Sequence, residues 1–420
     1  MKAIETPIIG KGQPMYETTH SFRDAHVTIP AGSPSLRLGI ILCLLVAAFS
    51  GTAFCAWDDA YDFPAKRDPY KWPFAGDSIW NTPIHRNAEY VHAHIPQATA
   101  FGMTEDEDII IITPNAPMTK VMEHNASWNR ARTRCESQTG KLLYQVPIPH
   151  DFSTDPGYSG ATPNMGVAVL MPDGRTLKQS QPFHRCGVGG VAVTQYLWPD
   201  VDIYADGVIG AHGGSGMSTL GGALRIGEMM PGSPPIHHAL KINLSGLNGS
   251  GYRWPAVHCD RGNPEVFDFN GINQKLEGAL FALRSDVDIK AMGLETEPAK
   301  YLARAFQDYG AYLVDGTGWN VYALITEWGP DGRFIDEFEK TWGFPFREAK
   351  KDTPWARDMD RLFANLHVIQ NSRKGFTGGG PDNDRKNRRA PVAPEFGKPS
   401  GATGGPVPWT PSVAKDWSVK

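Results

Sequence analysis

Residues 198–258 constrain the fold of this chain most, because they combine many glycines with many polar side chains. The stretch begins W-P-D-V-D-I-Y-A-D-G-V-I-G-A-H-G-G-S-G-M-S-T-L-G-G-A-L-R-I-G-E-M-M and later contains H-H-A-L-K-I-N-L and Y-R-W-P-A-V-H. Each glycine adds backbone entropy that folding must remove, so such a density of glycine indicates special backbone angles or the close approach of a ligand. We therefore expect one polar cleft here, formed by Asp202, Asp206, His212, Arg225, Glu228, His237, His238 and His258.

The composition favours β structure. The chain has 45 glycines and 34 prolines among 420 residues, which indicates many turns and short elements. Hydrophobic residues make up 41 % and charged residues 20 %, as in ordinary globular proteins. We predict a mostly β fold, a β-sandwich or a distorted barrel, with two peripheral helices at residues 297–309 and 355–368.

Three strand patterns support this prediction. Residues 108–113 form a β-branched run typical of a buried strand. A P-D-G turn at residues 172–174 joins two strand-like segments into a hairpin. Residues 311–324, on either side of D-G-T-G, predict a second hairpin, and residues 237–244 predict a further strand.

The N-terminal part predicts export. Residues 38–57 carry no charge and follow Arg37, and their apolar core has the length of a signal-peptide segment. The alternative is an uncleaved membrane anchor, because the run is about long enough to span a bilayer. We expect a secreted or periplasmic protein with an N-terminal extension at residues 1–57, one domain at residues 58–370 and a disordered Pro/Gly-rich tail at residues 371–420.

The formal net charge of −4 gives no electrostatic reason to expect nucleic acid as a partner. We expect a monomer that meets a membrane only through its N-terminal segment. Outside that segment lie Cys135, Cys186 and Cys259. In an oxidising compartment Cys135 and Cys186 are candidates for a disulfide, and Cys259 either pairs or is buried.

Several motifs follow one another in a fixed order: D-S-I-W-N-T-P-I, G-M-S-T-L-G-G-A-L-R-I-G-E-M, I-H-H-A-L-K-I, Y-R-W-P-A-V-H, A-F-Q-D-Y-G-A-Y-L-V-D and D-R-L-F-A-N-L-H-V-I-Q-N-S. The series resembles a group of exported, largely uncharacterised bacterial proteins from organisms rich in polysaccharide-degrading enzymes. The resemblance covers most of residues 74–372. It implies an exported protein connected with glycans.

Glu228 and Asp202 are candidates for glycoside hydrolysis, which needs one carboxyl group to protonate the leaving oxygen and another to attack or to activate water. Arg225 stands three residues before Glu228 and would hold a substrate carboxylate or hydroxyl. The competing interpretation is an Arg225–Glu228 salt bridge that only stabilises the core. For Asp206, the following Gly207 favours a structural turn.

Elimination by a lyase is the second possibility. It needs a base such as neutral His212 or His238, and a cation such as Arg225 beside a uronate carboxylate. If residues 237–244 form a strand, His237 and His238 point to opposite faces, and we expect His238 to face the core or the cleft.

No cofactor is predicted, although a divalent metal remains an alternative, because His212, His238, His258 and Asp202 are suitable ligand types without a metal-binding spacing. Trp198, Tyr204 and Trp254 are candidates for stacking on sugar rings, with Asp206 and His258 completing the substrate-binding set. The sequence thus predicts an exported carbohydrate-active enzyme that cleaves a polysaccharide, either a glycoside hydrolase or a polysaccharide lyase. The alternative is a non-catalytic glycan-binding or cell-envelope protein.

Overall fold

The computed structural model describes residues 67–127, 133–154, 164–247, 251–260, 265 and 276–396. The chain separates into two units, Met1–Trp57 and Asp58–Lys420, and all described residues belong to the second. The expected targeting segment lies outside the described residues. Among those that are described, no helix is long and apolar enough to cross a membrane.

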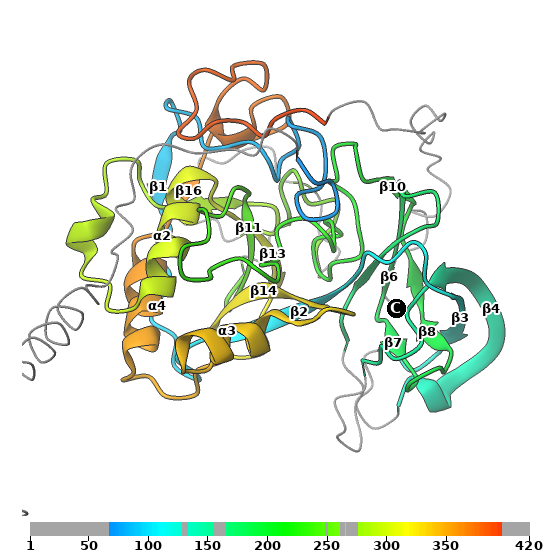
Figure 1. The fold of residues 1–420 in the computed structure, drawn as a ribbon. Helices are drawn as coiled ribbons and strands as arrows, with labels where there is room; N and C mark the ends of the chain where they lie inside the picture. The colour runs from blue at the N-terminus through cyan, green and yellow to red at the C-terminus, as the bar shows by residue number, and fades with distance from the viewer. Residues whose placement is uncertain are drawn as a thin grey trace, which may run out of the picture. The chain divides into compact units, whose positions relative to one another are not determined.

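Two β-sheets dominate the described part of the chain, which confirms the mostly β prediction (Figure 1). The larger sheet has the strand order β1-β16-β12-β13-β11-β14-β2-β5-β6-β10, with β15 beside β14 and β9 beside β6. Its strands are β1 (Tyr90–His92), β2 (Thr104–Ile111), β5 (Val167–Leu170), β6 (Thr176–Gln181), β9 (Tyr196–Leu197), β10 (Val201–Asp202), β11 (Leu240–Leu244), β12 (Leu280–Ala282), β13 (Ala311–Gly316), β14 (Tyr322–Gly329), β15 (Gly332–Arg333) and β16 (His367–Ile369). The smaller sheet has the order β4-β3-β8-β7, from β3 (Met118–His124), β4 (Gln138–Pro147), β7 (His184–Arg185) and β8 (Ala192–Thr194).

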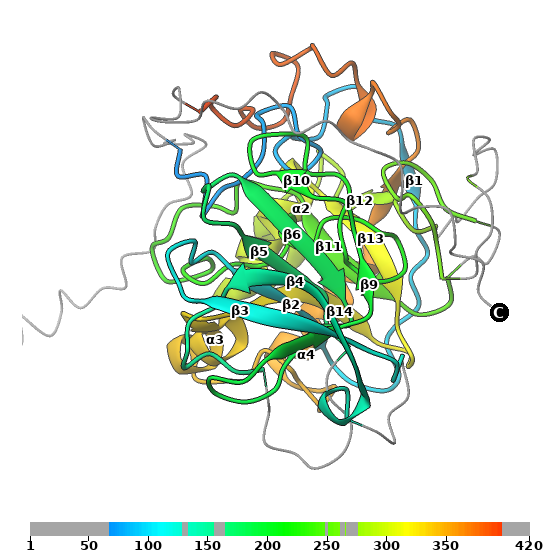
Figure 2. The ribbon, with the colours of Figure 1, turned by 90° about the vertical axis from the view of Figure 1, so that its right-hand side faces the viewer.

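The two sheets pack against each other through β2 and β5. Successive residues of a strand point to opposite faces. Ile109 and Ile111 of β2 therefore pack with Val121 and Val146 of the smaller sheet, whereas Ile110 packs into the core on the other side. Figure 2, seen from the side of the smaller sheet, shows β3 and β4 in front of β2 and β5. Burial on both faces explains the continuous apolar run in β2.

Helices α2 (Glu297–Asp308) and α4 (Pro354–Ala364) correspond to the two predicted helices. Their facing sides meet through Phe306 and Phe363, whose rings lie 5.9 Å apart. A third helix, α3 (Phe334–Trp342), was not expected from the sequence. Short 3-10 turns occur at η1 (Cys135–Ser137), η2 (Ile289–Met292) and η3 (Thr377–Gly379).

The predicted hairpin at residues 311–324 is wrong. Strands β13 and β14 do not pair, because β11 lies between them, parallel to β13 and antiparallel to β14. Every residue of β11 is buried, and a central position between two strands provides that burial. The hairpin of β5 and β6 around residues 172–174 is confirmed.

Residues 371–396 do not form the disordered tail that their composition predicts. Arg388 is only 3 % exposed, and its guanidinium donates hydrogen bonds to the carbonyl oxygens of Pro83 (3.0 Å) and Pro381 (2.8 Å). Ala393 is fully buried. The segment therefore belongs to the domain, and the part of the expected tail from residue 397 onward lies outside the described residues.

Cys135 and Cys186 form a disulfide with a Cα–Cα distance of 5.8 Å, as the sequence suggested. Cys186 directly follows β7, so the bond ties the η1 turn to the smaller sheet. The third cysteine of this part, Cys259, is buried and does not take part in the disulfide.

Candidate functional site

Glu228, Arg225 and His238 lie together, as predicted. The imidazole Nε2 of His238 lies 3.0 Å from Glu228 Oε1, and the backbone N–H of Arg225 donates to Glu228 Oε2 at 2.8 Å. The Arg225 guanidinium donates to Glu327 at 2.8 Å instead of reaching Glu228. The charge of His238 lowers the pKa of Glu228, although burial opposes this effect. The hollow beside His238 holds only about 10 Å³, less than a sugar ring needs.

Asp202 stands apart from this group. It forms a salt bridge with Arg175, with Arg175 Nη2 2.5 Å from Asp202 Oδ2, and its other oxygen accepts from the backbone N–H of Tyr204. Asp202 is 7 % exposed. These contacts hold the turn after β10.

His212 belongs to a third group. Its Nδ1 lies 3.0 Å from Asp108 Oδ2, and the ammonium of Lys241 contacts the same carboxylate. All three side chains are buried, with exposures of 3 % for His212, 1 % for Asp108 and 0 % for Lys241. The pKa of Lys241 is lowered by burial, an effect that the charge of Asp108 opposes.

The expected single cleft is therefore not formed by these residues. The predicted catalytic side chains divide among three sets of contacts, each completed by a partner that the sequence analysis did not consider: Arg175, Glu327 and the Asp108–Lys241 pair. The strand predicted at residues 237–244 begins only at Leu240, so His237 and His238 precede β11 and do not alternate across it. Burial lowers the pKa of His237 to about 4.

The predicted substrate-binding residues are likewise dispersed. The rings of Trp198 and His258 stack at 5.7 Å. Tyr204 packs edge-on against Phe396, and Trp254 packs against the main core. The carboxylate of Asp206 accepts from the backbone N–H of Val208 at 3.2 Å, as a turn residue does.

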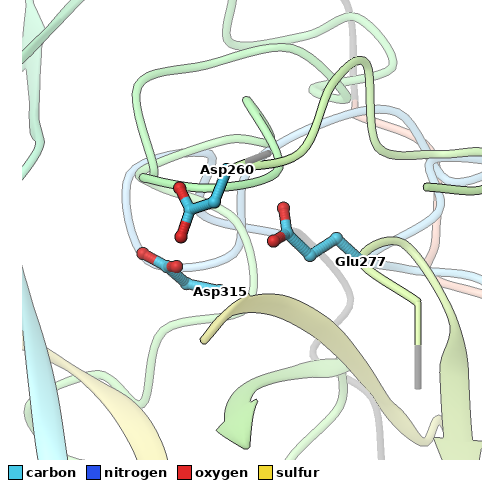
Figure 3. Close-up of side chains that lie close together, drawn as sticks. All are labelled: Asp260, Glu277 and Asp315. Atoms are coloured by element: carbon cyan, nitrogen blue, oxygen red, sulfur yellow. The ribbon is translucent and has the colours of Figure 1, made fainter. Parts of the chain in front are cut away.

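An open pocket of about 320 Å³ lies elsewhere, where three separate segments of the chain meet. We call it the acidic pocket. Its lining residues are Leu244, Gly246, Leu247, Gly251, Cys259, Asp260, Glu277, Gly316, Thr317 and Gly318. Among described residues, Asp260, Glu277 and Asp315 each place one carboxylate oxygen so that the three oxygens lie within 4.8 Å of one another. Figure 3 shows the three carboxyl groups turned toward each other.

These carboxyl groups differ in exposure. Asp260 is exposed, Asp315 is partly exposed, and Glu277 is 2 % exposed with no hydrogen-bond partner for its Oε2. Burial, and then the negative charge of Asp260, raise the pKa of Glu277 to about 8. Burial and the charges of Asp260 and Glu277 raise the pKa of Asp315 well above its usual value. Glu277 therefore holds a proton at neutral pH.

Backbone contacts from three segments fix the pocket. The N–H of Arg253 donates to the Glu277 carbonyl at 2.9 Å, and the N–H of Val257 donates to the Ser215 carbonyl at 2.9 Å. In β13 one extra residue interrupts the pairing with β11, so that Asn243 stands opposite Asp315. Such a bulge re-aims the side chains that follow it.

No family model, curated protein or solved structure matches the chain. The resemblance described above remains a prediction, and the function must be inferred from the residues themselves. Asp260, Glu277 and Asp315 are spaced so that they could hold a cation that prefers oxygen ligands, whereas the predicted ligands His212, His238 and Asp202 lie in separate groups.

Sequence reasoning missed the acidic pocket because its three carboxyl groups come from distant segments. One signal was present: D-G-T-G at residues 315–318 begins right after the apolar run A-Y-L-V, where a carboxylate reaches the end of a strand. Interpreting these residues as a hairpin turn concealed it.

Proposed function

We propose that this protein is an exported carbohydrate-active enzyme that hydrolyses a polysaccharide in the acidic pocket. The observation that carries the proposal is the pairing of a buried carboxyl group, Glu277, with an exposed one, Asp260, on the wall of an open pocket. Glycoside hydrolysis requires two carboxyl groups with such different environments.

Glu277 has the properties of the general acid. Its raised pKa keeps the carboxyl group protonated at neutral pH, so it can donate a proton to the glycosidic oxygen as the bond to the leaving sugar breaks. Asp260 supports this role, because its negative charge makes ionisation of Glu277 more costly.

Asp260 then supplies the carboxylate that attacks the anomeric carbon. One oxygen from each of the three carboxyl groups lies within 4.8 Å of the others, an arrangement compatible with the separation of about 5–5.5 Å between carboxyl groups in retaining enzymes. We therefore expect a glycosyl-enzyme intermediate on Asp260. Water subsequently hydrolyses it, with Glu277 accepting the proton, so the anomeric configuration is retained.

Elimination is less well supported. A lyase needs a cation beside the uronate carboxylate, but among the described residues that line the pocket none is cationic. Arg225, the cation expected for that role, is held by Glu327 and by the Tyr70 carbonyl oxygen.

Export is supported by the disulfide between Cys135 and Cys186, since disulfides persist mainly in oxidising compartments. We therefore place the proposed activity in the periplasm or outside the cell.

A screen of the full-length protein against polysaccharides tests this function. Release of reducing ends indicates hydrolysis, absorbance of unsaturated uronates indicates elimination, and binding without either product indicates a glycan-binding protein. Asp260→Asn should lose at least about 100-fold in rate. Asp286→Asn, which alters an exposed carboxylate paired with Arg284, is the matched control and should retain the wild-type rate.

A further inference from the structure

The acidic pocket has an unbalanced charge. Asp260 and Glu277 line it and Asp315 adjoins it, while the described lining residues include no lysine, arginine or histidine. None of the three carboxyl groups takes part in an ion pair within the described part of the chain. Glu277 is only 2 % exposed, and no described group donates a hydrogen bond to its Oε2. A ligand that supplies hydrogen-bond donors and positive charge would complete this site.

A large exposed aromatic side chain stands directly beside the pocket. Trp319 follows the lining residue Gly318 and is 56 % exposed. Hydrogen bonds hold its backbone on both sides: Thr317 Oγ1 donates to the Trp319 carbonyl at 2.6 Å, and the Asn320 carbonyl accepts from the N–H groups of Thr99 and Ala100. An exposed tryptophan leaves a large apolar area in water, so its presence next to a lining residue indicates a contact surface.

We propose that the acidic pocket binds a polysaccharide built of amino sugars, with one protonated amino sugar against the carboxyl groups and the adjacent sugar ring stacked on Trp319. This inference rests on the proposed function and names its substrate class. The ammonium group of such a sugar pairs with the Asp260 carboxylate and can also donate a hydrogen bond to the carbonyl oxygen of protonated Glu277, whereas a uronate would place a second negative charge beside Asp260. The indole face suits the apolar face of a sugar ring.

Binding of matched oligosaccharides to the full-length protein tests the inference without requiring turnover. Oligomers of glucosamine, N-acetylglucosamine and a uronic acid, equal in length, are titrated by calorimetry. We expect glucosamine oligomers to bind at least about tenfold more tightly than their N-acetylated counterparts, and uronate oligomers to bind weakest. Asp260→Asn should reduce the preference for glucosamine oligomers about tenfold.

Trp319→Ala should weaken binding of both amino-sugar series about tenfold, and Trp319→Phe should restore most of the loss. Trp319 is exposed, so neither change should affect folding. Tri-lysine is the control for simple charge attraction and should bind more weakly than glucosamine trimer.

Each contrary result has a distinct meaning. Four results would each overturn the inference. Uronate oligomers could bind as tightly as glucosamine oligomers or more tightly, or tri-lysine could bind as tightly as glucosamine trimer. The protein could bind none of the oligomers, or Trp319→Ala could bind them with wild-type affinity. Binding of glucosamine oligomers without cleavage would leave the inference standing and overturn the hydrolase. Cleavage restricted to uronic-acid polymers would overturn the inference and leave an enzyme.

Discussion

Glu277 and Asp315 face the same glycine. A Cβ atom at Gly214 would lie 2.9 Å from Glu277 Oε2 and 2.8 Å from Asp315 Oδ1, and the φ angle of this glycine is +62°. The glycine-rich stretch that dominates the sequence therefore does approach a polar site, but the carboxyl groups of that site come from other segments.

Gly214→Ala should lower both stability and activity. The side chain would be strained by the positive φ and would displace both carboxyl groups, so we expect a loss of about 1–3 kcal/mol in the free energy of unfolding. Urea titration and hydrolysis assays measure the two effects. Gly232→Ala is the control, since its φ is +79° with no atom within 4 Å. Equal losses in the two variants would show that the carboxyl groups are not affected.

Glu277 should make the protein less stable as pH rises. Its pKa is raised from 4.5 to about 8 by burial, so the folded protein holds a proton that the unfolded chain releases across this interval. The stability that this proton contributes is present below about pH 4.5 and is lost as pH rises toward 8. Urea titrations of wild type and Glu277→Gln across this range should show a decline in the wild type that is smaller in the variant. Parallel curves would contradict the raised pKa.

Chelation should leave hydrolysis unchanged. The proposed reaction uses a proton on Glu277 and requires no cation, so activity in EDTA should equal activity without it. A calcium salt added near pH 8 should inhibit, because a cation among the three carboxylates would displace protons. Loss of activity in EDTA, with recovery on adding calcium, would indicate metal-dependent chemistry instead.

Reduction of the disulfide should destabilise the smaller sheet. Cys135 and Cys186 close a loop of 51 residues, and such bonds contribute about 2–4 kcal/mol. Cys135→Ser combined with Cys186→Ser should lower the free energy of unfolding by about this amount. Hydrolysis by the folded fraction should persist, since the acidic pocket contains neither cysteine. An unchanged unfolding curve would contradict this role.

Residues 371–396 should be necessary for folding. Arg388→Met leaves several buried carbonyl oxygens without a donor, at a cost of about 1–3 kcal/mol for each unsatisfied group. Lys386→Met, which alters an exposed side chain of the same segment, is the control and should change stability by less than about 0.5 kcal/mol. Thermal unfolding compares them, and equal melting temperatures would show that the segment is dispensable.

Short sequence patterns were enough to predict individual helices and one hairpin. Helix α2 could be predicted because Pro298 lies in its first turn and its apolar residues recur at helical spacing, and the hairpin of β5 and β6 because its turn residues are specific. The position of β11 between β13 and β14 could not, because strand order depends on contacts between distant residues. The sequence suggests Asp202 and Glu228 as a catalytic pair because both lie in the glycine-rich stretch. In the structure Asp202 contacts Arg175, and Glu228 contacts His238.

The rates of polysaccharide hydrolysis by Glu277→Gln and Glu228→Gln, measured side by side with the wild type, test the central claim most directly. Both substitutions replace a carboxyl group by an amide, one in the acidic pocket and the other in the contact between Glu228 and His238. The account predicts a loss of at least about 100-fold for Glu277→Gln and a rate within about threefold of wild type for folded Glu228→Gln. Full activity of Glu277→Gln, with activity lost in Glu228→Gln, would contradict it.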